Sequence, residues 1–363
     1  MIRGANMNAG RFIGGEFAFV SPEKFARDLS RNCAGPQDII YTQRGTLGQV
    51  ALVPRGMYET FVVSQSQMRL RVDPTRAVPE FVYYASTTAD FLRQIEDRAI
   101  STGVPHTNLG ILAELTIPLP PLLEQQAIAE VLGALDDKIA ANTALSKAID
   151  RYLACLFEKS ASTVPDVPLS TIADVNRSTV KPQPGRALRY IDIASVGTGS
   201  FEYPDRSLWD DAPGRARRGV APGDTIWSTV RPNRRSHAVV IDDDPELVAS
   251  TGLAVLSPRE VGFAYLYEAT KRPTFSGYLE NVAEGSAYPA VRADRFLDAP
   301  IPLVDAATRA AFENVASPLR RLVASANREN RSLAETRDAL LPHLMSGKLR
   351  VREAEAAVSA AGV

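Results

Sequence analysis

The chain contains little of what metal centres, disulfides and nucleophilic active sites are made from. It has two cysteines and three histidines among 363 residues, and these do not cluster. Cys33 and Cys155 lie far apart in sequence, which fits a reducing cytoplasm better than a disulfide framework. Without a group of cysteine and histidine ligands, a structural zinc site is not expected.

Long apolar segments and a strong net charge are lacking as well. No run of about 18 uncharged apolar residues is available for a transmembrane helix. The first ten residues, MIRGANMNAG, lack the apolar core of a signal peptide. The hydrophobic content is 45% and the formal net charge is −1. These values indicate an ordinary soluble protein with room for two or three domains, and no membrane partner.

Catalytic signatures are missing too. There is no G-x-x-x-x-G-K-[ST] phosphate loop, and GTLG at 45–48 is better explained as a tight turn than as a dinucleotide fingerprint. The motif of amino-methyltransferases is absent, because the only Pro-Pro pair, at 120–121, is followed by leucine. His106 and His237 have no catalytic partner near them in sequence. We therefore expect a non-enzymatic protein with no cofactor of its own.

What the chain does contain is a long internal repeat. Residues 105–119 read PHTNLGILAELTIPL, and residues 289–303 read PAVRADRFLDAPIPL. The separation is far longer than the period of a solenoid, which is about 20–50 residues. Each copy leads into a long helical pattern, so the chain holds two copies of a domain followed by a helix.

Both repeated domains are predicted to be rich in β-strands. Short apolar runs are separated by glycine and proline turns, and one short helix is expected late in each domain, at 88–100 and 263–272. The expected strands lie at 39–42, 50–54, 61–64 and 81–86 in the first domain, and at 171–175, 188–193, 223–227, 237–242 and 253–257 in the second.

The first long helix is predicted over 124–159, with a heptad-like apolar stripe. Asn142 and Ser146 interrupt the stripe, and a buried polar residue there can fix helix register. The stretch 136–138, Asp-Asp-Lys, is interpreted as a solvated face on the outer side of the seam, with a metal site as the lesser alternative. The seam comprises Ile128, Leu132, Leu135, Ile139, Asn142, Ser146, Ile149, Leu153 and Leu156.

The second long helix is predicted over 308–344. Pro318 lies inside this pattern and should kink or restart the helix, and the residues after 350 are expected to fray. Two helices of equal length can return antiparallel and bury their stripes on each other. The alternative is two unrelated core helices, each packed on its own domain. The second seam comprises Phe312, Val315, Leu319, Leu322, Ala326, Glu329, Leu333, Thr336 and Leu340.

Polar and basic loops follow matching strands in the two copies. Residues 214–236 hold six arginines against one aspartate, whereas 124–159 is acidic, so one part of the chain could meet phosphate and another protein. Arginine, asparagine and glutamine are the side chains that read base edges, although an arginine-rich loop is more often only a solvated surface. These loop residues are Gln43, Arg44 and Thr46 in the first copy, and Arg231, Asn233, Arg234 and Arg235 in the second.

Several motifs together resemble the specificity subunits of type I restriction-modification systems. The stretch IPLPPLLEQQAIAEVLGALDDKIAAN at 117–142 is typical of that family, and RDALLPHLMSGKLRV at 337–351 is similar to its usual terminus. GDTIWSTVRP at 223–232 and TGVPHTNLGIL at 102–112 resemble segments of its target recognition domains. The resemblance covers nearly the whole chain.

The resemblance implies an α+β fold with two β-rich target recognition domains separated by two long helices that form an antiparallel coiled-coil spacer. Each domain would read one half of a bipartite site in double-stranded DNA. The helices would set the spacing and recruit two modification (methyltransferase) subunits, with restriction/translocase subunits added to these. S-adenosylmethionine, Mg and ATP would be used by those partners in the cytoplasm. The expected segments are 1–117, recognition domain 1; 118–160, spacer helix 1; 161–302, recognition domain 2; 303–350, spacer helix 2; and 351–363, a tail.

Two sets of site residues accompany this interpretation. DNA contacts are expected from Arg3, Asn6, Gln43, Arg44, Thr46, His106, Asn108, Arg217, Arg218, Arg231, Asn233, Arg234, Arg235, Tyr288 and Arg292. Subunit contacts are expected from Glu124, Gln125, Leu135, Ile139, Asn142, Leu319, Leu322 and Leu340.

The two copies are unequal at their starts. MIRGANM at 1–7 aligns with YIDIASV at 190–196, so about 25 residues of opening strand and turn in the second copy have no counterpart in the first. A start codon placed too far downstream and a truncated first domain both explain this. A degenerate subunit that reads one half-site, and a non-enzymatic coiled-coil adaptor, therefore stay open as alternatives.

Overall fold

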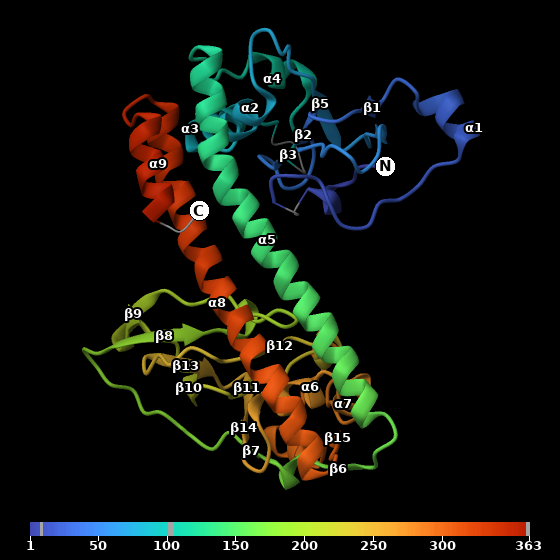
Figure 1. The fold of residues 1–363 in the computed structure, drawn as a ribbon, viewed down its shortest axis with the longest axis vertical. Coiled ribbons are helices and arrows are strands. Elements are labelled where there is room, and N and C mark those ends of the chain that lie inside the picture. The colour runs from blue at the N-terminus through green and yellow to red at the C-terminus, as the bar shows by residue number, and fades with distance from the viewer. Residues whose placement is uncertain (8–9, 101–104, 361–363) are drawn as a thin grey trace. The chain divides into compact units, whose positions relative to one another are not determined.

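A computed structural model describes residues 1–7, 10–100 and 105–360. The chain divides into unit 1, which combines Met1–Thr143 with Arg328–Val363, and unit 2, which is Ala144–Asn327. Each unit joins a β-rich domain to one half of α5 (Leu122–Ala161) and one half of α8 (Ala306–Met345) (Figure 1). Within the described ranges, every helix is too short or too polar to span a bilayer.

Unit 1 is built on a three-stranded antiparallel sheet with β2 in the centre and β3 and β5 on either side. A second pair, β1 with β4, lies near the amino end of the unit. Its strands are β1 (Cys33–Ala34), β2 (Ile39–Thr42), β3 (Val50–Leu52), β4 (Phe61–Val62) and β5 (Gln67–Leu70); the short turns η1 (Gly4–Asn6), α1 (Pro22–Lys24) and η2 (Phe25–Leu29) precede them.

The helices of unit 1 are α2 (Pro79–Ala85), α3 (Ala89–Arg98), α4 (Leu109–Glu114) and α9 (Val351–Ala360). The expected strand at 81–86 is wrong, because these residues form α2. All residues from Phe81 to Ala85 are buried, so the segment shows an unbroken apolar run in which helix and buried strand look alike. Pro79 at the first helical turn was the signal for the helix.

Unit 2 contains two four-stranded sheets, in the orders β12-β11-β14-β7 and β10-β13-β8-β9, and a β15-β6 pair. The strands are β6 (Asp166–Pro168), β7 (Ala173–Val175), β8 (Ala187–Ile191), β9 (Arg206–Leu208), β10 (Ala216–Gly219), β11 (Thr225–Ser228), β12 (His237–Val239), β13 (Leu247–Ser250), β14 (Leu253–Pro258) and β15 (Pro300–Pro302). The helices are α6 (Phe263–Thr270) and α7 (Pro273–Asn281), with short turns η3 (Leu169–Thr171), η4 (Ile193–Ser195), η5 (Trp209–Asp211), η6 (Pro232–Arg234) and η7 (Ala293–Asp298).

The repeat in sequence is a repeat in strand register. Tyr41 of β2 lies opposite Met68 of β5, and Trp227 of β11 lies opposite Ala254 of β14. Ile2 pairs in parallel with Val63, as Ile191 does with Ala249, which agrees with the alignment of 1–7 on 190–196. β6 and β7 of unit 2 have no counterpart among the described residues of unit 1.

The two long helices run antiparallel in both units. In unit 1, Asp136 pairs with Arg337 and Asn142 with Asn330. In unit 2, Asp150 pairs with Arg320, and the rings of Phe157 and Phe312 lie 5.4 Å apart. The α8 number falls each time as the α5 number rises. The expected antiparallel packing is confirmed, and the alternative of two helices that pack only on their own domains is wrong.

The α5 seam is predicted correctly, but two of the nine expected α8 seam positions are displaced by one residue. Val315 and Leu322 are 40% and 45% exposed, whereas Ala316 is fully buried and Val323 is partly buried in the unit 2 core. The sequence favours the larger side chains as seam positions. A small alanine lies inside because Phe157 and Phe312 already fill that layer of the core.

Two expectations about helix ends are corrected. Pro318 does not restart the second helix, because α8 continues through it; Pro318 is exposed, so water can satisfy the carbonyl that loses its partner. The residues after 350 form α9 rather than a frayed tail. Ala354 and Val358 are buried in the core of unit 1 together with Leu344.

Each unit also buries a polar network where its domain meets the helices. In unit 1, Tyr84 of α2 donates to Asp136 of α5 over 2.7 Å, and Arg337 of α8 donates to the same carboxylate. The expectation that Asp136 lies on a solvated face is wrong, because its carboxylate is paired with Tyr84 and Arg337. In unit 2, Glu268 of α6 accepts from Arg320 of α8. No metal-binding cluster occurs within 1–7, 10–100 and 105–360.

Candidate nucleic-acid interface

The loop after β11 in unit 2 is held in an unusual backbone conformation. Arg231 and Arg235 both adopt left-handed backbone angles, with φ of 53° and 52°, and the turn η6 lies between them. This conformation costs a non-glycine residue about 1 kcal/mol or more, so the surroundings must impose it. The Arg231 amide donates to the Pro289 carbonyl over 2.7 Å. Asn233 and Arg234 are exposed at the tip of the loop.

A second loop, residues 284–290, lies beside this one. It is closed by reciprocal backbone hydrogen bonds between Glu284 and Ala290, both 2.9 Å long. Tyr288 projects from it and is 69% exposed. The Arg231 guanidinium lies 4.4 Å from the centre of the Tyr288 ring. An arginine ordered against an exposed aromatic ring can contact phosphate or stack on a base.

Arg235 is corrected as a candidate base contact. Its guanidinium donates to the Lys271 carbonyl, and its own carbonyl lies 2.6 Å from Nδ1 of His237. His237 in turn stacks on Trp227, with ring centres 4.7 Å apart. Arg235 therefore anchors the loop to the core, and Asn233 and Arg234 are left to face outward.

The pH dependence of unit 2 follows from His237. Burial, together with the nearby cations Lys271 and Arg235, lowers the pKa of His237 from 6.5 to about 4. Between these values the unfolded chain binds more protons than the folded one, so stability falls as pH falls from about 6.5 to 4. The loss approaches about 3 kcal/mol. Urea unfolding followed by tryptophan emission will show this, because both tryptophans, Trp209 and Trp227, lie in unit 2. A His237→Gln variant that keeps the full wild-type slope in this window contradicts the assignment.

The remaining basic candidates in unit 2 are partly buried or already paired with a carboxylate. Arg217 and Arg218 lie on β10, half-buried, where residues 178–180 run alongside them. Arg292 is exposed, and its Nε lies 3.3 Å from the Asp294 carboxylate. No hydrogen bond within the described chain connects these three side chains to Asn233 or Arg234.

Unit 1 repeats the arrangement with fewer charges. The Thr107 amide donates to the Gln43 carbonyl over 3.0 Å, as the Val291 amide does to Thr229 over 2.7 Å. Arg44 pairs through its backbone with His106. Arg44 and Thr46 are exposed.

The amino-terminal candidates of unit 1 divide into one exposed and one buried residue. Arg3 is exposed. Asn6 is only 1% exposed, and its amide group donates to the carbonyls of Gly14 and Glu16, each over 2.9 Å. Asn6 thus holds the amino-terminal loop together, and it is corrected as a base contact.

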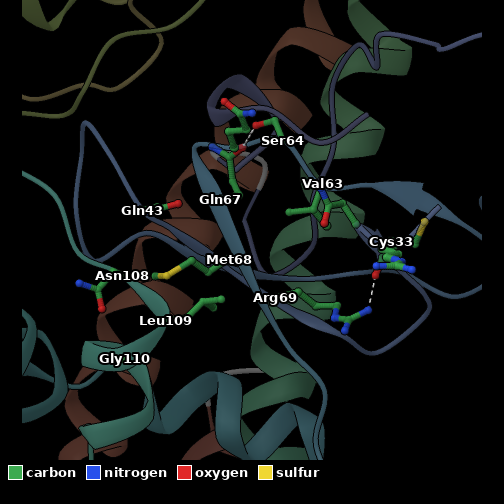
Figure 2. A pocket seen from close by; sticks show the side chains of 13 residues that line it. Cys33, Gln43, Val63, Ser64, Gln67, Met68, Arg69, Asn108, Leu109 and Gly110 are labelled. Carbon is green, nitrogen blue, oxygen red and sulfur yellow. Dashed lines mark hydrogen bonds between the residues drawn. The ribbon is translucent and has the colours of Figure 1, made fainter. Parts of the chain in front are cut away.

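Unit 1 also contains a cleft of about 740 Å³ that the sequence did not reveal (Figure 2). Figure 2 shows Gln43 and Asn108, both expected to contact DNA, together with Cys33 and Arg69 from β1 and β5. Asn108 is occupied in part, since its side-chain oxygen caps α4 by accepting from the Ile111 amide over 2.9 Å. The lining residues that the sequence analysis missed include Arg31, Asn32, Ser64, Gln65, Gln67 and Arg69.

The expected subunit contacts also separate by burial. Gln125 is fully buried; its side chain accepts from the Val78 amide and donates to the Pro120 carbonyl. Such a residue pins the start of α5 to its own domain and cannot meet a partner. Leu135, Asn142 and Leu340 are likewise buried, Ile139 and Leu319 are partly buried, and Glu124 and Leu322 are exposed.

Comparison with known proteins gives consistent similarities. Residues 32–151 match the family model described as the type I restriction modification DNA specificity domain. The MjaVIII specificity subunit of Methanocaldococcus jannaschii is 21% identical over 334 residues, which span 84% of this chain and 77% of that protein. The HindI specificity subunit of Haemophilus influenzae is 25% identical over 125 residues, 33% of this chain and 27% of that protein.

One solved structure shares the fold. The crystal structure of the type I restriction-modification system S subunit from M. genitalium superposes with a TM-score of 0.56 at 18% identity, and the match covers 86% of this chain and 83% of that one. At this identity the likeness concerns the arrangement of the elements, which includes both β-rich regions and both long helices.

Proposed function

Because this chain belongs to the specificity subunits of type I restriction-modification systems, we propose that its two units read the two halves of a bipartite site in double-stranded DNA. The chain is the non-catalytic DNA specificity component of such a system. S-adenosylmethionine and ATP are used by the modification and restriction subunits. Mg is also expected to be used by those subunits.

The observation that supports this proposal most is the loop Arg231–Arg235 of unit 2. Its left-handed backbone is maintained by contacts to Pro289 and Lys271, and the result is that Asn233 and Arg234 project together. Asparagine forms paired hydrogen bonds with adenine and arginine with guanine in the major groove. The Arg231 guanidinium, which packs on the Tyr288 ring, can contact the adjacent phosphate or stack on a base.

Replacing Arg234 or Asn233 tests this assignment. In Arg234→Ala or Asn233→Ala protein combined with its modification subunit, discrimination between the preferred site and a site altered at one base pair should fall by about 1–3 kcal/mol. Electrophoretic or anisotropy titrations against both duplexes at one salt concentration measure it. Arg206→Ala serves as the matched control, because Arg206 is an exposed arginine of the same unit that is paired with Glu246 and is not among the expected DNA contacts. An equal loss of affinity on every sequence makes the loop a phosphate contact and contradicts base reading.

The helices are proposed to set the distance between the half-sites and to recruit two modification subunits, with restriction/translocase subunits joining later in the cytoplasm. Exposed apolar side chains at the start of α5 support a protein contact there: Leu123 is 81% exposed and Leu119 50%. Glu124 adjoins them. Large exposed leucines grouped in this way are typical of interaction surfaces.

A subunit that reads one half-site is the second candidate. The observation in its favour is that unit 1 has a three-stranded sheet where unit 2 has four strands, and that its loop after β2 carries fewer arginines. Binding to an oligonucleotide with the unit 2 half-site alone, compared with the bipartite site, separates the two. Equal affinity for both supports half-site reading, and clear preference for the bipartite duplex supports the first proposal. An adaptor that binds no DNA would prefer neither.

A further inference from the structure

Arg235 occupies a position of the repeat where unit 1 has a glycine. The register of β11 with β12 matches that of β2 with β3. Arg235 therefore corresponds to Gly48, since each lies two residues before the first residue of the outer strand. Both adopt left-handed backbone angles, with φ of 52° and 83°. Glycine adopts this conformation without strain, whereas arginine does not. Unit 2 thus has an arginine where the backbone favours glycine, which points to a role for its side chain.

The Arg235 side chain reaches the turn between α6 and α7. Its guanidinium donates to the Lys271 carbonyl in that turn. The short turn η6, which carries the exposed Asn233 and Arg234, packs on α7. The position of the Asn233–Arg234 tip is therefore set by where the turn at 271–272 lies.

Two cations hold this turn against the long helices within unit 2. Lys271 Nζ lies 2.6 Å from the Asp150 carboxylate of α5, and Arg272 Nε donates to Glu158 of α5 over 2.8 Å. The two acids lie about 12 Å apart along the helix axis, so they fix both the position and the orientation of the turn. Arg320 of α8 donates to the same Asp150 oxygen over 2.9 Å. The side chains of Lys271 and Arg272 are largely buried, which limits screening of these pairs by salt.

Unit 1 forms the same turn, between α2 and α3, without these cations. The N-cap residue is Thr88 for α3 and Arg272 for α7, so Thr87 corresponds to Lys271. The hydroxyls of both threonines donate to carbonyls of α2, each over 2.8 Å. Among residues 1–7, 10–100 and 105–360, neither threonine has a hydrogen bond to α5 or α8. Formation of the turn does not require ion pairs, so the two cations of unit 2 serve another purpose.

We propose that Lys271 is a positioning residue for base reading by unit 2. Its ammonium group ties the α6–α7 turn to Asp150 on α5, and its carbonyl holds Arg235. Arg235 in turn holds the Asn233–Arg234 tip. This inference rests on the proposed function, in which the tip reads bases and the long helices recruit modification subunits. The link then keeps the bases read by unit 2 in a fixed place relative to the helices that carry the methyltransferase.

Lys271→Thr, which introduces the residue of unit 1, tests the inference in the full-length chain combined with its modification subunit. Anisotropy titrations compare the preferred duplex with a duplex altered at the base pair to which Arg234→Ala is sensitive. Discrimination between the two should fall at least about fivefold. Asp150→Asn breaks the same ion pair from the helix side at a half-exposed carboxylate, and it should act in the same direction. Arg206→Ala removes a cation elsewhere in unit 2 and should leave discrimination unchanged.

A double variant separates positioning from general stabilisation of unit 2. If Lys271 acts through the tip, Lys271→Thr should lower discrimination no further in an Arg234→Ala background. A lysine that only stabilises the fold weakens binding to both duplexes equally. Arg235→Gly gives a second measurement, because glycine relieves the left-handed backbone strain. Its urea midpoint should stay near that of the unchanged chain, while discrimination falls at least about fivefold.

Two results would overturn the inference and leave the proposed function intact. The first is unchanged discrimination in Lys271→Thr although Arg234→Ala lowers it. The second is a double variant in which the two losses multiply. If Lys271→Thr does not fold, Asp150→Asn and Arg235→Gly decide the question by the same titrations. If Arg234→Ala itself leaves discrimination unchanged, base reading by the tip is wrong, and the role of Lys271 in it is overturned as well.

Discussion

Leu135→Asp is expected to unfold unit 1 at room temperature. Leu135 is fully buried in the core that joins α5, α8 and the β-rich domain of this unit. Removing a buried leucine side chain costs about 2–5 kcal/mol, and an aspartate in its place has no partner in the described core, which adds a desolvation cost of several kcal/mol. The sum is comparable to the whole stability of a typical domain.

Circular dichroism measures the loss, because the affected halves of α5 and α8 and all of α9 are helical. Leu123→Asp is the matched control: it places the same change on the same helix, at a side chain that is largely exposed. It should shift the urea midpoint little. Equal unfolding in both variants, or a native-like transition in Leu135→Asp, contradicts the packing described for unit 1.

Glu268→Gln is expected to destabilise unit 2 by about 3–5 kcal/mol. The side chains of Glu268 and Arg320 are 1% and 4% exposed and form an ion pair, with Lys271 Nζ a further 3.1 Å from the carboxylate. Glu268, Tyr267 and Asp150 hold the pKa of Arg320 above its ordinary value despite burial. An arginine keeps its charge even when its main partner is neutralised, and the remaining carboxylate partner of Arg320, Asp150, is half-exposed.

Tryptophan-detected urea unfolding measures this effect in unit 2. The double variant Glu268→Gln with Arg320→Met should recover most of the loss, since replacing both members of a buried pair by groups of similar volume is often nearly neutral. If the double variant is as unstable as the sum of the single changes, the two side chains are not coupled and the assigned pair is wrong.

How far the sequence predicted the structure depended on whether a pattern was local. The α5 stripe was read correctly because seven of its nine positions carry leucine or isoleucine at heptad spacing. Two positions of the α8 seam were misplaced because Ala316 is buried and Leu322 is not, and only packing against the partner helix decides that. The strand β2 was predicted to the residue, whereas α2 was taken for a strand because it is apolar on every side.

The candidate site shows the same division. The loop Arg231–Arg235 was found from its composition. That Arg235 anchors the loop, and does not face outward, depends on the Lys271 carbonyl, 36 residues away. Asn6 was selected by residue type, and its burial depends on Gly14 and Glu16. Arg31 and Asn32 were missed because their match to Arg217 and Arg218 appears only in strand register, not in spacing. Residue chemistry can be read locally, while availability is a property of the fold.

In each unit, the long helix that follows the β-rich domain contributes one charged side chain to the buried network, and the two charges have opposite sign. The side chain is Asp136 of α5 in unit 1 and Arg320 of α8 in unit 2. The repeat places Tyr84 where unit 2 has Glu268, and Asp136 where unit 2 has Arg320. A recognition domain moved from the second place to the first would bring an acid against Asp136. Transfer of a domain between the two places would therefore also require a compensating change at this position of the helix. If each unit reads one half-site, as proposed, this charge pair ties the order of the half-sites to the sequence of the long helices.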